Sequence, residues 1–142
     1  MARTEGDIAG AAAELIDAFN EADWSRLRPL LASDLVYDET GTGRRVEGAD
    51  AYVALLDGWK AVFPDVAGTI RDAITSDNVV AQEIHWHGTQ TGPLETPTGT
   101  VEASGKPVSV DASIWYRFQG EAISEIHHYL DVATLLEQIG AR

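Results

Sequence analysis

Residues 106–131, KPVSVDASIWYRFQGEAISEIHHYLD, decide the fold class of this chain. Two runs rich in β-branched and aromatic residues, 106–118 and 122–131, flank the breaker QGE, and this pattern predicts two strands joined by a turn. Two earlier runs of the same kind, 66–76 and 78–92, meet at the breaker SDN. The second half of the chain is therefore expected to form a sheet of antiparallel strands.

The first half of the chain, and its last residues, show helical periodicity instead. Apolar residues recur at helical spacing in four segments: 7–20, 23–31, 46–63 and 131–140. A short strand, 34–40, and the Gly-rich turn GTGRR precede the third of these helices, which Pro64 ends. Helices followed by antiparallel strands predict an α+β fold. We expect one domain over residues 1–142, with a strongly curved sheet wrapped as a cone around the N-terminal helices.

Composition limits the function classes. The chain has 142 residues, no Cys and a net charge of −13. An acidic surface repels nucleic acid and anionic membranes, and the lack of Cys excludes disulfides and thiolate chemistry. No apolar run approaches the ~18 residues that a membrane helix needs, and the N-terminus has no apolar signal segment. We expect a cytoplasmic protein without nucleic-acid or membrane partners.

The segment HWH, residues 85–87, raises the question of a metal site. On a strand, His85 and His87 lie on one face together with Glu83, which is possible zinc or iron geometry. If Trp86 points into the cone, however, both histidines point outward. We expect no metal. The Gly-rich segments lack the strand–turn–helix context of a phosphate loop, and the longer one, GTQTGPLETPTG, is a candidate lid.

Four segments together resemble the SnoaL-like polyketide cyclases, of the superfamily that also holds nuclear transport factor 2 and ketosteroid isomerase. They are AFNEADWSRLRPLLASDLVYDE, GADAYVALLDGWKAVFPD, the Gly-Thr-x-Thr-Gly turn of WHGTQTGPLETPTG, and RFQGEAISEIHHYLDVATLLEQIG. The resemblance covers nearly the whole chain. It implies a conical α+β barrel with a deep apolar pocket for a hydrophobic or aromatic small molecule, and a homodimer formed through the outer sheet face. It also implies intramolecular aldol ring closure of a polyketide ester without metal or organic cofactor.

The resemblance places His128 where the cyclases carry their acid/base aspartate. Histidine titrates near neutral pH and therefore suits general acid/base work. Strand alternation puts His128 on one face with Ile126 and Leu130, and His127 on the other. Asp131 ends the strand, where it can orient an imidazole or, alternatively, cap the following helix.

Tyr37, Asp38 and Glu39 lie on the first strand, and any of the three can point inward. The resemblance places Glu39 close to the general-base aspartate of the ketosteroid isomerases, and Tyr37 near a polar pocket residue of the cyclases. A carboxyl group in an apolar cone is expected to have a raised pKa and can serve as a base.

Aromatic side chains are expected to line the pocket, since flat ligands stack on them. The candidate lining residues are Trp59, Phe63, Trp86, Ile114, Tyr116 and Ile126. The resemblance argues against steroid isomerisation, because Leu15 and Ile114, which are apolar, stand where the isomerases carry their oxyanion donors. A register slip of one residue would instead turn Asp111, Ser113 and Trp115 inward.

The sequence thus favours a small cofactor-independent enzyme that removes a proton alpha to a carbonyl group, with aldol cyclisation as the specific expectation. An isomerase or dehydratase in the same pocket is the alternative enzyme class. A non-catalytic protein that binds a hydrophobic ligand, or a dimeric scaffold, remains open.

Overall fold

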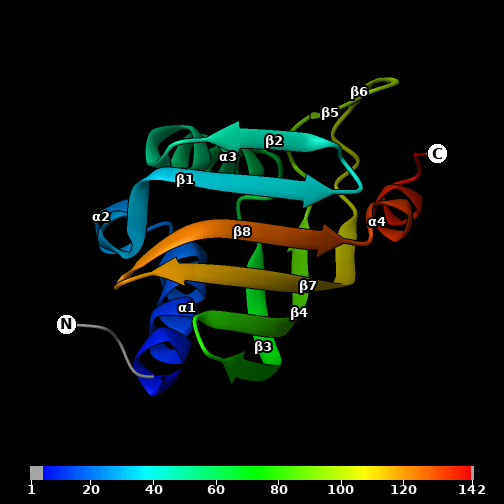
Figure 1. The fold of residues 1–142 in the computed structure, drawn as a ribbon. Helices are drawn as coiled ribbons and strands as arrows, with labels where there is room; N and C mark the ends of the chain where they lie inside the picture. Colours follow the sequence, from blue (N-terminus) through cyan, green and yellow to red (C-terminus); the bar gives the residue numbers. More distant parts are fainter. Residues whose placement is uncertain (1–4, 142) are drawn as a thin grey trace.

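The computed structural model describes residues 5–141 (Figure 1). The helical elements are α1 (Glu5–Asn20), α2 (Trp24–Leu27), the 3₁₀ helix η1 (Arg28–Leu30), α3 (Ala49–Val62) and α4 (Val132–Gln138). The strands are β1 (Leu31–Thr40), β2 (Arg44–Glu47), β3 (Ala67–Ser76), β4 (Val79–Thr89), β5 (Leu94–Thr96), β6 (Gly99–Val101), β7 (Pro107–Gln119) and β8 (Ala122–Leu130). The predicted α+β class is confirmed.

Six strands form one sheet in the order β2-β1-β8-β7-β4-β3, and β5 and β6 form a separate hairpin. All neighbours in the large sheet are antiparallel except β1 and β8, which run parallel. This parallel pair differs from the purely antiparallel expectation. It joins a strand from the first third of the chain to the strand that comes last in the sequence.

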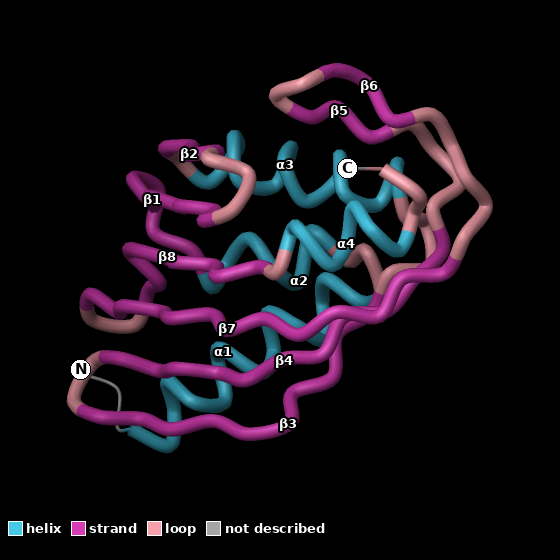
Figure 2. Tube along the Cα trace, turned by 90° about the vertical axis from the view of Figure 1, so that its right-hand side faces the viewer, coloured by secondary structure: helices cyan, strands magenta, loops and turns pink. Residues whose placement is uncertain are grey.

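The sheet curves around the helices. Figure 2 shows the strands of the large sheet as one bent layer, with α1, α3 and α4 on its concave side and the β5–β6 hairpin apart from it. The helices and the concave face of the sheet enclose the hydrophobic core, which includes Leu15 and Phe19 of α1, Leu56 of α3 and Tyr116 of β7. In β7 alternate residues are buried, so one face of this strand joins the core and the other faces outward.

Two predicted helices are shorter than expected. The second ends at Leu27 and gives way to η1, because Pro29 cannot supply the amide hydrogen that an α-helix needs there. The third begins at Ala49 rather than at residue 46, because Arg44–Glu47 pair with β1 as a strand. The β5–β6 hairpin begins within GTQTGPLETPTG, residues 88–99, the Gly-rich segment considered as a lid, and extends beyond it to Val101.

Within residues 5–141 there is no helix of the length and apolarity that crossing a membrane requires.

Trp86 lies against a glycine that leaves room for its ring. A Cβ added at Gly68 of β3 would come within 2.7 Å of the Trp86 ring, closer than carbon atoms pack. The Asn20 side chain bonds both main-chain groups of Gly68, with distances of 3.0 Å to its oxygen and 2.8 Å to its nitrogen. Phe19 packs edge-on against the same indole. Three residues from two elements, Phe19 and Asn20 of α1 and Gly68 of β3, thus set the position of Trp86.

We expect Gly68→Ala to destabilise the fold by about 1–3 kcal/mol, because the added methyl group overpacks against Trp86. Gly58→Ala is the matched control, since a Cβ at this helical position meets nothing within 4 Å. That control is expected to stabilise the protein by about 1 kcal/mol through helix propensity. Urea unfolding measures both, and equal effects of the two substitutions would show that Trp86 does not rest on Gly68.

Candidate active site

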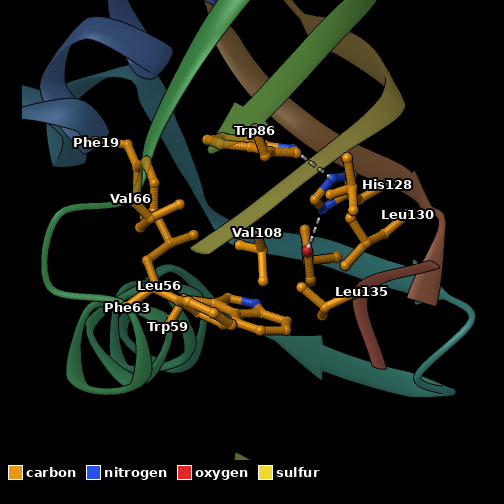
Figure 3. A pocket seen from close by; sticks show the side chains of 12 residues that line it. Phe19, Leu56, Trp59, Phe63, Val66, Trp86, Val108, His128, Leu130 and Leu135 are labelled. Atoms are coloured by element: carbon orange, nitrogen blue, oxygen red, sulfur yellow. Dashed lines mark hydrogen bonds between the residues drawn. The ribbon is translucent and has the colours of Figure 1, made fainter. Parts of the chain in front are cut away.

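An apolar cavity of about 60 Å³ lies between the helices and the concave face of the sheet. The side chains around it (Figure 3) come from α1, α3, α4, the strands β1, β4, β7 and β8, and the loop between α3 and β3. Most are apolar, such as Phe63, Val108 and Leu135, whereas His128 and Tyr37 bring polar atoms to its wall. We call this space the inner cavity.

The parallel pairing of β1 with β8 assembles the polar part of the site. Its register places Glu39 beside His128 and Tyr37 beside Ile126. Alternation along β1 then turns Tyr37 and Glu39 inward, and both side chains are buried. Asp38 lies on the opposite face, where it pairs with Arg45 at 2.9 Å.

A chain of hydrogen bonds crosses the site in one direction. The Trp86 indole nitrogen lies 3.2 Å from Nε2 of His128, and an indole N–H can only donate. His128 Nε2 therefore accepts, and the neutral imidazole carries its hydrogen on Nδ1. Nδ1 lies 2.9 Å from the Tyr37 hydroxyl, which accepts this hydrogen and donates its own to Glu39 Oε2 at 2.6 Å.

Glu39 is the acceptor at the end of this chain. Its Oε2 also accepts from the Trp59 indole at 3.0 Å. Its Oε1 accepts from the Thr42 hydroxyl at 2.7 Å and from Nε and Nη2 of Arg44 at 2.9 and 2.7 Å. The carboxylate is 1% exposed and receives five hydrogen bonds, so it is fully satisfied as an anion.

The pKa values follow from these contacts. Burial acts to raise the pKa of Glu39, but the hydrogen bond from Tyr37 and the charge of Arg44 outweigh it and lower this pKa overall. The raised pKa expected for this carboxyl group is therefore wrong, because the cone supplies donors as well as apolar walls. Burial, and next the Glu39 charge, raise the pKa of Tyr37 well above its usual value.

Burial also keeps His128 neutral. It lowers the pKa of the imidazole from 6.5 to about 4, although the Glu39 charge acts in the opposite direction. At neutral pH the site thus holds an ionised carboxylate, a protonated phenol and a neutral imidazole whose lone pair is on Nε2. Such an imidazole can accept a proton and pass the resulting charge toward Glu39 through Tyr37.

The other candidate residues from the sequence divide into two groups. Trp59, Phe63 and Trp86 line the inner cavity with His128 and Tyr37. Three candidates lie in the core away from its wall: Ile114, Tyr116 and Ile126. The Tyr116 hydroxyl donates to the buried Gln82 at 2.7 Å, so this phenol is satisfied within the sheet.

Asp131 lies outside the inner cavity. Its carboxylate accepts from the main-chain N–H of Thr134 at 3.1 Å and from the Thr134 hydroxyl at 2.7 Å. It therefore caps α4, the second of the two roles considered from the sequence. The lowered pKa of Asp131 has the same cause, the hydrogen bonds from Thr134.

The histidines of the HWH segment lie on the outer face of the sheet, because Trp86 between them points into the cone. His85 bonds Asp111 through Nδ1 at 2.8 Å and Ser109 through Nε2 at 2.6 Å. Among residues 5–141, no group of three or more His, Cys, Asp or Glu side chains is arranged to hold a metal ion.

Arg44 and Thr42 were missed by the sequence analysis, which treated GTGRR as a turn. A signal for them exists. A hairpin closed by the four residues TGTG (40–43) pairs Glu39 directly with Arg44, and this is the register that β1 and β2 adopt. An acid and a base at paired positions across a short hairpin predict an ion pair.

We expect the imidazole of His128 to titrate near pH 4, and NMR of ring-labelled protein would measure it. The folded state binds fewer protons than the unfolded chain between pH 6.5 and 4. The stability that neutral His128 contributes is therefore complete above about pH 6.5 and is lost as the pH falls toward 4. A midpoint at or above 6.5 would contradict the neutral, Nδ1-protonated imidazole.

Comparison with known proteins places the chain in a family. The profile of the SnoaL-like polyketide cyclases matches residues 10–139, whereas no curated protein is significantly similar. IdmH from Streptomyces antibioticus, described as a candidate polyketide cyclase, is 26% identical, with a TM-score of 0.78 over 94% of this chain and 98% of its own.

Two further solved structures share the fold at lower identity. A candidate SnoaL-like polyketide cyclase from Jannaschia sp. CCS1 is 18% identical, with a TM-score of 0.87 over 100% of this chain and 99% of its own. TsrD from Streptomyces laurentii is 18% identical, with a TM-score of 0.85 over 99% of both chains. On the profile match, which spans most of its length, this chain belongs to the SnoaL-like polyketide cyclase family.

Proposed function

We propose that this protein is a small enzyme that removes a proton alpha to a carbonyl group, with His128 Nε2 as the base. The observation that carries the proposal is the directed hydrogen-bond chain from Trp86 to Glu39. It holds a neutral imidazole at the wall of an apolar cavity with its lone pair on one defined nitrogen. Family membership supports chemistry at a carbonyl compound.

The first step transfers the α-proton of the substrate to Nε2 of His128 and leaves an enolate. The imidazolium then donates from Nδ1 to Tyr37, whose hydroxyl donates to the ionised Glu39. This carboxylate lies two hydrogen bonds from the ring and favours the charged form. A base with a pKa near 4 is strong enough for this work, since a general base with a pKa of about 4.6 removes α-protons in ketosteroid isomerase.

Trp86 supplies the donor for the enolate oxygen. Its N–H lies at the cavity wall and is held by His128 Nε2, the atom that the substrate's proton must reach. Arrival of the substrate replaces this hydrogen bond with two others, from the indole to the carbonyl oxygen and from the α-carbon toward Nε2. The Tyr37 hydrogen, in contrast, is committed to Glu39.

We propose aldol cyclisation as the overall reaction. The enolate carbon forms a bond to a second carbonyl carbon of the same molecule, and the alkoxide produced takes the proton from His128 Nε2. Base and acid are then one residue, and no atom or electron is gained or lost. Proton abstraction without ring closure, as in an isomerase, uses the same first step and remains the second reaction to test.

We expect His128→Ala to lower turnover by about 10²-fold or more, the size typical of a lost acid/base group. The measurement uses aromatic polyketide esters and activated ketones, followed by mass spectrometry and absorbance. His127→Ala is the control, because its side chain faces outward beside Asp38 and should leave turnover unchanged. Equal turnover of His128→Ala and the wild type would exclude His128 as the base, and retention of ligand without turnover would indicate a binding protein.

Trp86→Phe should lower kcat by about 10²–10³-fold, the cost of removing one oxyanion donor. The substitution keeps an aromatic ring above Gly68 but removes the N–H. KM is expected to change much less than kcat, because the hydrogen bond strengthens as charge develops on the oxygen. A loss confined to KM would reduce Trp86 to a part of the apolar wall.

A further inference from the structure

A second cavity lies beside the inner one. It has a volume of about 460 Å³, and its walls come from the β1–β2 turn, the segment 94–98 of the β5–β6 hairpin, α3 and α4. We call it the outer chamber. Two side chains, Trp59 and Leu135, line both spaces. They form the partition between the outer chamber and the part of the protein that contains His128.

The two volumes suit different parts of a ligand. The outer chamber falls within the ~300–1,000 Å³ range of small-molecule sites. The inner cavity, at about 60 Å³, is well below the ~150 Å³ of an apolar cavity that accepts benzene. An aromatic ring already present in the substrate, or a branched group, therefore fits the outer chamber better than the inner cavity. A group that enters the inner cavity from the outer chamber must be narrow.

The side chains of the partition are held in place. Trp59 donates its N–H to Glu39 at 3.0 Å and lies between Arg44, whose guanidinium is 4.9 Å from its ring, and Phe63. Leu135 is 4% exposed and belongs to α4. These contacts leave Trp59 and Leu135 little freedom to move. The partition therefore selects ligand groups by their shape.

Helix α4, which carries Leu135, is anchored at both ends. Asp131 caps its first turn, and the Gln138 amide exchanges two hydrogen bonds with the main chain of Ser109 on β7, at 2.7 and 2.9 Å. The backbone of α4 at Leu135 therefore cannot move away from the sheet without loss of the Gln138–Ser109 hydrogen bonds.

Charge in the outer chamber disfavours an anionic ligand. The positive charge of Arg44 is paired with Glu39. Glu95, a second wall residue, brings a carboxylate that accepts from Thr100. The net charge of −13 also disfavours an anion.

We propose that the substrate is an elongated carbonyl compound without negative charge, with its body in the outer chamber. Its reacting end is no wider than a methyl ketone and passes between Trp59 and Leu135 to reach His128. Leu135 is then a residue that determines specificity, because its side chain sets the width of this passage. The identity of the reacting end rests on the proposed function, whereas the division of the site into two spaces does not.

The test uses two ketones with the same phenethyl body and different ends: 4-phenylbutan-2-one, which ends in methyl, and 4-methyl-1-phenylpentan-3-one, which ends in isopropyl. Binding is followed by the shift of the Trp59 indole N–H resonance, and exchange of the terminal α-hydrogen with D₂O is followed separately. The wild type should prefer the methyl ketone by at least about tenfold, the lower bound for discrimination by one or two carbon atoms.

Leu135→Ala should reduce this preference to below about threefold, because it widens the passage. Leu136→Ala is the matched control, since Leu136 lines only the outer chamber. It should weaken binding of both ketones and retain the preference. If Leu135→Ala does not fold, Leu135→Val removes a single methylene and should give an intermediate preference.

Full preference retained in a folded Leu135 variant, or equal loss of preference in Leu136→Ala, would overturn the proposal, as would a failure of the methyl ketone to bind. Selective binding of the methyl ketone without exchange of its α-hydrogen has a different meaning. It would support the two-space site and contradict proton abstraction by His128.

Discussion

The Glu39 carboxylate organises the candidate site. A buried charge is costly unless it is paired and its lone pairs are filled. Arg44, Thr42, Trp59 and Tyr37 meet this demand, and each thereby has its position or its hydrogen direction set by Glu39. Because the carboxylate can only accept, the Tyr37 hydroxyl must donate to it. This fixes which group donates and which accepts in each of the other hydrogen bonds that link Glu39 to Trp86. An ion on one side of the site thus determines which nitrogen of His128 carries a lone pair on the other side.

A histidine at position 128 fits this arrangement for a physical reason. An ionised aspartate at this position would lie next to a second carboxylate in an apolar cavity. A neutral imidazole avoids that repulsion while it keeps a basic atom at the wall. It also needs a partner for Nδ1, which Tyr37 provides. The imidazole at position 128 and the Tyr37–Glu39 pair therefore belong together.

Much of the fold could be predicted from the sequence, because periodicity is a local property. The long strands and α1 follow it closely. The parallel pairing of β1 with β8 could not be predicted, since pairing between distant strands leaves no local pattern. For the same reason the sequence left open which of Tyr37, Asp38 and Glu39 faces inward. The pKa of Glu39 was predicted in the wrong direction because its donors, Arg44 above all, come from a segment that looks like a plain turn.

The site residues, like the fold, could be predicted where a local pattern marks them but not where their role depends on contacts between distant segments. Trp59 and Trp86 could be selected as aromatic residues on amphipathic elements. Their N–H groups, however, donate to different acceptors, the Glu39 carboxylate and the His128 imidazole, and only the three-dimensional structure reveals this. Leu135 carried no signal, since an apolar residue on a short helix is typical of any core. Its importance arises from its place between two cavities.

The parallel β1–β8 pair also has a consequence for how the protein is made. Tyr37 and His128 are 91 positions apart in the chain, and β8 is the last strand. Contacts of such separation form late, because the chain must first close a long loop. On the ribosome, β1 must wait until Ala122–Leu130 have emerged before its partner exists. Until then Glu39 has no imidazole beside it, and one edge of β1 is open to mispairing in the nascent chain.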